Sequence, residues 1–229
     1  MNASDIGIAG SLVGLTVALG ALAARGLIRF ARDRVRIQLM WGLGLAFATL
    51  ATGVELIVYL GFVNGFLLET YVFLSAAIVG FLSLGSTRVI RSTWFRQSYT
   101  IYVLATCVVV AVLSFTTPLP SSMVTSGVIT GNPPLGLIVV SSCVTVPATV
   151  VLLGAVVVAL RRSWRWQTLM MGVGACVLAA GGALYIASFP VALYYSEFIG
   201  IVLIFFGLVS LPHLATSPVK AGLSPRRTG

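Results

Sequence analysis

Residues 97–160 form a stretch without a single Asp, Glu, Lys or Arg. Charged residues make up about a quarter of an ordinary soluble domain, so a stretch of this length without them indicates that lipid surrounds it. A helix that crosses a bilayer needs about 20 mainly apolar residues, which makes the stretch too long for one span. The turn-rich sequence TTPLPSSMVTSGVITGNPPLG, residues 116–136, predicts the break between two spans.

Apolar windows of spanning length recur along the whole chain and predict an all-α, seven-transmembrane-helix bundle. The expected spans are residues 6–25, 38–62, 66–87, 99–117, 134–160, 168–189 and 192–213. With 8% charged residues and a mean hydropathy of +1.08, we expect no separate soluble domain. The chain is therefore predicted to be a single integral membrane domain over residues 1–229, with residues 214–229 as a short cytoplasmic tail.

The basic residues test this count independently, because cytoplasmic loops carry the positive excess. All fourteen follow the odd-numbered spans: Arg25, Arg29, Arg32, Arg34, Arg36, Arg88, Arg91, Arg96, Arg161, Arg162, Arg165, Lys220, Arg226 and Arg227. The expected orientation thus has the N-terminus outside and the C-terminus in the cytoplasm. The same clusters are expected to meet anionic lipid headgroups, and their position between apolar runs argues against nucleic acid as a partner.

Two spans begin with similar sequences, RIQLMWGLGLAFATLATG from Arg36 and RWQTLMMGVGACVLAAGG from Arg165. One interpretation is a 3+1+3 parallel repeat, in which the fourth span inverts the second three-helix unit and a site lies between the halves. The other is chance, since glycine and apolar residues recur in any membrane sequence. Within the fifth span, Pro147 removes a backbone donor and predicts a kink, which either is tolerated or marks a cavity or hinge.

Cysteine spacing gives no sign of a metal or redox site. Cys107, Cys143 and Cys176 are more than thirty residues apart and each lies in an apolar run, so they are expected to be buried small hydrophobic residues. The spans also contain no His-based dyad, metal-ligand cluster or Ser/Lys pair. We therefore expect no enzyme activity, no metal and no cofactor.

Three acids are predicted to lie in the outer half of the spans: Glu55, Glu69 and Glu197. A charged side chain at the centre of a spanning helix costs about 2.5–3.5 kcal/mol on the insertion scale. Lys and Arg are confined to the opposite ends of the spans and cannot pair with these acids. The acids are therefore expected to be protonated, hydrated in a cavity or bonded to hydroxyl groups.

Tyrosines are the hydroxyl partners within reach. Glu55 and Tyr59 are four residues apart, and Tyr194 and Glu197 three apart, so each pair shares one face of a helix. The predicted ligand-binding residues of an outward-facing polar pocket are Glu55, Glu197, Glu69, Tyr59, Tyr194, Tyr71 and Tyr185. In the alternative interpretation, Glu69 lies at the membrane interface and the others form structural hydrogen bonds.

Seven spans with the N-terminus outside resemble the topology of microbial rhodopsins, but residues 192–213 contain no lysine to hold retinal. The three-plus-one-plus-three plan is similar to sugar transporters of the SWEET class and their PQ-loop relatives, although the chain has no Pro-Gln dipeptide. Sequences such as FLSLGSTRVI and EFIGIVLIFFG resemble those of poorly characterised prokaryotic seven-helix membrane proteins. That resemblance implies the fold and no particular function.

These observations favour a multi-pass protein of the cell membrane that binds a small polar solute or a cation from outside and transports it. The alternative is a non-transporting sensor or regulatory subunit that acts through a partner membrane protein, or through a second copy of the chain. The short predicted tail, without an output domain, favours transport over self-contained signalling.

Overall fold

The computed structural model describes residues 3–34, 36–87, 90, 92–125, 127–129, 133–162, 166, 169–170, 172–174, 176–177, 196, 199–200 and 202–203. The first five predicted spans lie in this part of the chain. The sixth and seventh, 168–189 and 192–213, lie largely outside it, and the residues within them that are described are helical.

Five long helices dominate the described residues and confirm the all-helical prediction. They are α1 (Ala3–Asp33), α2 (Arg36–Tyr59), α3 (Gly65–Ser86), α4 (Thr93–Thr116) and α5 (Leu135–Arg162). Each contains a segment that is long and apolar enough to cross a membrane. The chain is thus a multi-pass, membrane-embedded protein by the length and composition of its helices.

Two helix boundaries differ from the predicted ones. Helix α1 continues eight residues beyond position 25, because Ala, Leu and Arg sustain a helix after the apolar window has ended and basic side chains favour its C-terminal turn. Helix α4 begins at Thr93 instead of residue 99, since the Ser92 hydroxyl accepts a hydrogen bond from the Phe95 N–H and caps the helix there.

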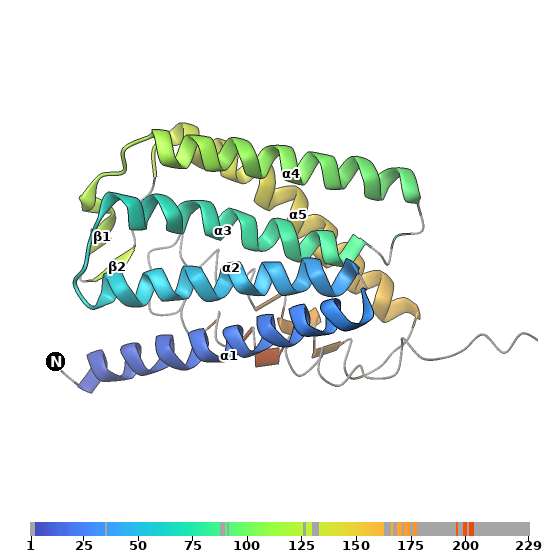
Figure 1. Cartoon of the computed structure of the whole chain (residues 1–229), viewed down its shortest axis with the longest axis horizontal. Helices are drawn as coiled ribbons and strands as arrows, with labels where there is room; N and C mark the ends of the chain where they lie inside the picture. Colours follow the sequence, from blue (N-terminus) through green and yellow to red (C-terminus); the bar gives the residue numbers. More distant parts are fainter. Residues whose placement is uncertain are drawn as a thin grey trace, which may run out of the picture.

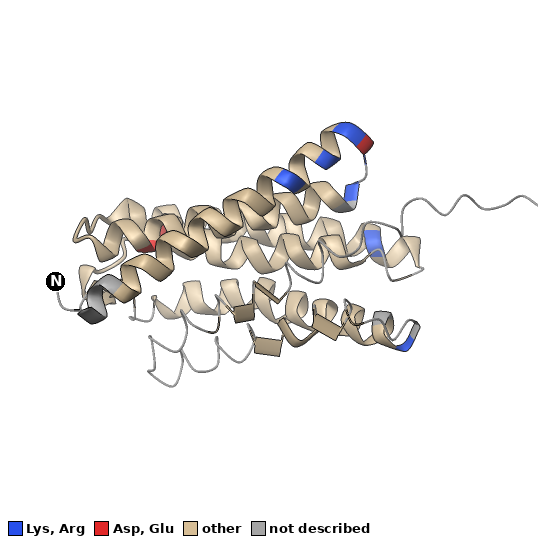
Figure 2. Cartoon of the chain, turned by 90° about the horizontal axis from the view of Figure 1, so that it is seen from below, with Lys and Arg blue, Asp and Glu red and all other residues tan. Residues whose placement is uncertain are grey.

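The five helices run alternately up and down, as Figure 1 shows. Helix α3 is the most central, packing against α2, α4 and α5, and α1 packs against α2. We call the end where α1, α3 and α5 terminate the arginine end, because the described Lys and Arg residues gather there (Figure 2). The other end is called the hairpin end, after the segment that covers it.

Apolar side chains form three clusters along the bundle. One joins α1, α2 and α3 around Leu19, and another joins α3, α4 and α5 around Val103. The third lies at the hairpin end, where α2 and α3 meet the connection between α4 and α5. Its buried members are Val54, Val58, Leu68, Leu119, Met123, Ile129 and Leu137.

The α4–α5 connection folds into a small cap over the hairpin end (Figure 1). It contains a 3-10 turn, η2 (Ser121–Met123), and two short antiparallel strands, β1 (Val124–Thr125) and β2 (Val128–Ile129). Gly127 in the turn has a φ of +78°, a conformation that glycine adopts without a steric penalty. The sequence was predicted to be a turn-rich break and nothing more, so this hairpin is an addition to the prediction.

Candidate functional site

Glu55 is the buried acid of the described bundle. It lies one turn before the end of α2 and is only 4% exposed. Tyr71 on α3 donates a hydrogen bond to its carboxyl group, whereas the other carboxyl oxygen, Oε2, is buried without a hydrogen-bond partner among the described residues. A buried carboxyl oxygen in this state is energetically costly, which makes Glu55 the candidate site residue of this end of the bundle.

The cap packs against the stretch of α2 that carries Glu55. Val54 and Val58, the neighbours of Glu55 on α2, pack in one cluster with Met123 and Ile129 from the cap. Tyr71 is half-buried against the same cluster. Glu55 is thus buried beside this apolar cluster, and the outward-facing pocket stays a prediction.

Tyr59 and Glu69 were predicted to belong to the same site. Tyr59 is the last residue of α2, and a Cβ placed on Gly127 would lie 3.4 Å from its carbonyl oxygen, so the hairpin turn rests on it. The Glu69 side chain runs back along α3, with Oε1 3.9 Å from the position of a Gly65 Cβ. There the carboxylate lies near the positive end of the α3 dipole. Glu69 is half-buried, as expected for an acid near the interface.

Three of the predicted ligand-binding residues, Glu197, Tyr185 and Tyr194, lie outside the described residues. The structure therefore brings together Glu55 and Tyr71 and places Tyr59 under the hairpin at the same end.

A polar contact that the sequence analysis missed lies one turn from Glu55. The Thr52 hydroxyl is 3.2 Å from the Thr16 hydroxyl, which joins α2 to α1, and it also bonds the Ala48 carbonyl. Thr52 and Glu55 are three residues apart and share a helix face. This spacing could have predicted from the sequence that Thr52 belongs to the same polar face. Polar side chains from α1, α2 and α3 thus line one depth range of the bundle.

At the arginine end the structure contains a cleft that the sequence did not predict. Its volume is about 850 Å³, and it lies between the start of α2, the end of α3 and the start of α4. Arg34, Arg36 and Arg96 line it, together with threonines and apolar side chains. The basic clusters in the sequence indicate positive charge at this end of the bundle. They do not indicate which arginines line the cleft.

Cysteines and metal ligands add no further site within the described residues. Cys107 is buried as predicted, but the prediction is wrong for Cys143 and Cys176, which are exposed. No group of three or more His, Cys, Asp or Glu side chains able to hold a metal ion occurs in this part of the chain.

No protein-family model, curated protein or solved structure matches this chain. Its function is therefore inferred from its own residues and their geometry.

Proposed function

We propose that the chain is a seven-helix protein of the cell membrane that binds a cation or a small polar solute at Glu55 and transports it. The N-terminus lies outside and the C-terminus in the cytoplasm, since the described arginines gather at one end and the positive-inside rule assigns that end to the cytoplasm. The hairpin end then faces outward. The sixth and seventh spans complete the bundle, and the 3+1+3 repeat places the site between its halves.

The unpartnered Oε2 of Glu55 is the observation that carries this proposal. Carboxylates inside membrane spans usually belong to ion or substrate pathways. Burying an acid there costs free energy, so such residues are rare where they have no function. Tyr71 holds one side of the carboxyl, which leaves the other oxygen for a cation, a proton or a hydrogen-bond donor of the solute. Glu197, Tyr185 and Tyr194 contribute from the second half of the repeat, and Tyr59 and Glu69 lie toward the outside.

The cap supplies the outer gate in this proposal. It packs apolar side chains against Val54 and Val58, the neighbours of Glu55 on α2, and belongs to the connection between α4 and α5 rather than to a helix. Opening of such connecting segments typically occurs on microsecond to millisecond timescales. In the proposed alternating access, the cap closes the outer side in one state and opens it in the other.

Uptake by proteoliposomes tests the proposal. The purified chain would be assayed for gradient-driven movement of protons, Na⁺, K⁺, amino acids and sugars. Glu55→Gln should abolish the uptake found for the wild type, because the amide cannot bind a cation or exchange a proton. Asp33→Asn is the matched control, since it makes the same chemical change at the arginine end and should leave uptake unchanged. Wild-type uptake by Glu55→Gln would overturn the assigned role.

A wild-type protein that moves none of these solutes would instead support the regulatory alternative, provided that it copurifies with a partner membrane protein in mild detergent. A second copy of the chain would count as such a partner. Glu197→Gln extends the test to the seventh predicted span and should abolish uptake as Glu55→Gln does.

A further inference from the structure

The cleft at the arginine end has the size and lining of a ligand site. Its volume of about 850 Å³ falls within the range of about 300–1,000 Å³ that is usual for small-molecule sites. It opens between three helix termini: the start of α2 at Arg36, the end of α3 near Gly85, and the start of α4 at Thr93. It lies at the end of the bundle opposite Glu55 and is independent of the proposed transport site.

Three arginines from three parts of the chain line this cleft. Arg34 belongs to the α1–α2 connection, Arg36 begins α2, and Arg96 lies in the first turn of α4. None of the described residues that line the cleft is acidic. The Nε atom of Arg96 is buried without a hydrogen-bond partner in the described structure. A buried charged donor in this state points to an anion as its missing partner.

The backbone at Arg34 supports the same conclusion. Its φ of +54° lies in the left-handed region, where a side chain is disfavoured and glycine is preferred, and its N–H bonds the Phe30 carbonyl as in a helix C-cap. An arginine at a backbone position that favours glycine indicates that its side chain has a functional role. The strained backbone presents this guanidinium to the cleft.

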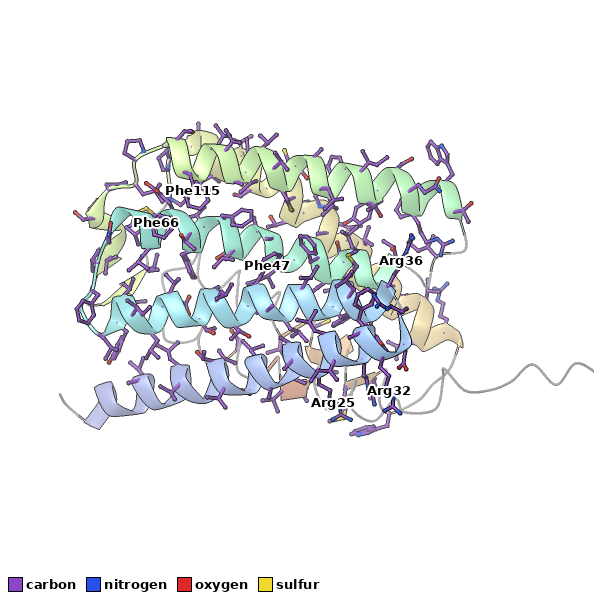
Figure 3. All side chains as sticks on the ribbon, viewed as in Figure 1. Arg25, Arg32, Arg36, Phe47, Phe66 and Phe115 are labelled. Carbon is purple, nitrogen blue, oxygen red and sulfur yellow. The ribbon has the colours of Figure 1, made fainter. Side chains whose placement is uncertain are left out.

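We propose that the cleft binds a phosphate group, carried either by an anionic lipid headgroup or by a small soluble phosphate. Arginine forms bidentate hydrogen bonds with phosphate oxygens, and three such side chains with no competing carboxylate match an anion of that shape. Thr93, the first residue of α4, also lines the cleft, so the positive end of that helix dipole lies beside it. Arg25 and Arg32, in contrast, project from α1 away from α3 and α4 (Figure 3).

Two probes distinguish the sources of the phosphate group. The full chain is placed in nanodiscs of phosphatidylcholine, with or without phosphatidylglycerol, and retained lipid is counted by native mass spectrometry. Inorganic phosphate is then titrated into the phosphatidylcholine sample, and the shift of the unfolding temperature is measured. Selective retention of phosphatidylglycerol identifies a headgroup site. A saturable shift with phosphate identifies a soluble ligand, and the absence of both overturns the proposal.

The variants decide whether this cleft is responsible. Arg96→Gln should weaken binding by about 10- to 100-fold, the usual effect of losing a hydrogen bond to a charged group. Arg34→Gly should also weaken binding, but without lowering the unfolding temperature of the ligand-free protein, because glycine relieves the left-handed backbone. Arg32→Gln removes the same charge from the same end of the bundle and should bind as the wild type does. Equal losses in all three variants would indicate diffuse attraction and overturn the site.

Discussion

The Tyr102 hydroxyl on α4 donates a 2.6 Å hydrogen bond to the carbonyl oxygen of Cys143 on α5. Cys143 lies four residues before Pro147, whose missing N–H would otherwise have bonded that carbonyl within the helix. A hydrogen bond from a neighbouring helix is one of the ways in which proline is accommodated in a membrane span. The proline that the sequence marked as a kink thus frees an acceptor that connects two helices.

This relationship predicts a coupled pair of substitutions. Tyr102→Phe should lower the free energy of unfolding by about 0.6–1.7 kcal/mol, the range measured for hydrogen bonds between membrane helices. In a Pro147→Ala background the same change should have little effect, because the alanine N–H can bond the Cys143 carbonyl. Unfolding in mixed micelles with increasing SDS would give the four values of the double-mutant cycle. Equal losses in both backgrounds would contradict the coupling.

Glu55 is expected to lower the free energy of unfolding while it serves the proposed uptake. Glu55→Met removes a buried carboxyl whose Oε2 is unpartnered and fills its volume with an apolar side chain. Such replacements are often neutral or stabilising by about 1–4 kcal/mol in protein interiors. We therefore expect Glu55→Met to unfold at an equal or higher SDS fraction while uptake is lost. A clear loss of stability would show that the Glu55–Tyr71 hydrogen bond is mainly structural.

Much of the architecture follows from the sequence, because the bilayer makes hydropathy a reliable guide to helix position. Each of the first five predicted spans overlaps one of the five long apolar helices, and Tyr71, a predicted site residue, bonds Glu55. The helical extension of α1 was not predicted. An apolar window ends at the first charged residue, whereas a helix can continue through charged residues.

The hairpin and the arginine cleft show where sequence reasoning stops. The Val-Thr-Ser-Gly-Val-Ile sequence around Gly127 carries a recognisable two-residue turn, but only the packing of the cap determines what it covers. Arg34 and Arg96 are about sixty residues apart in sequence. Their meeting depends on how each helix is rotated about its axis, and the charge pattern that places them at one end says nothing about that rotation.

Gly85 should be intolerant of a side chain because the Trp41 ring occupies the space of its Cβ. Gly85→Ala is expected to destabilise the protein by about 1–3 kcal/mol, as overpacked cores commonly do. It should also disturb the phosphate cleft, which Gly85 lines. Gly53→Ala is the control, since nothing lies within 4 Å of its Cβ position and alanine favours the helix by about 0.5–1 kcal/mol. Equal behaviour of the two variants in an SDS titration would refute the packing argument.

The cap is expected to open and close reversibly at the hairpin end, and cysteine labelling can measure the rate of opening. Val58→Cys, in a background with Cys107, Cys143 and Cys176 changed to alanine, places a thiol on the fully buried Val58 position beneath the cap. A membrane-impermeant maleimide added from outside should label it slowly. Leu60→Cys, at a position that is 58% exposed at the same end, should label rapidly.

Met123→Ala should then release the cap. Met123 is 2% exposed in the cluster that holds the cap against α2 and α3, and truncating such a residue removes about 2–5 kcal/mol of packing. If opening is local, even about 2 kcal/mol raises the open population and the labelling rate of Val58→Cys about thirty-fold. The rate for Leu60→Cys should stay constant. Faster labelling at both positions would indicate general unfolding, and an unchanged rate at Val58→Cys would show that the cap is not the barrier that separates Glu55 from the outside.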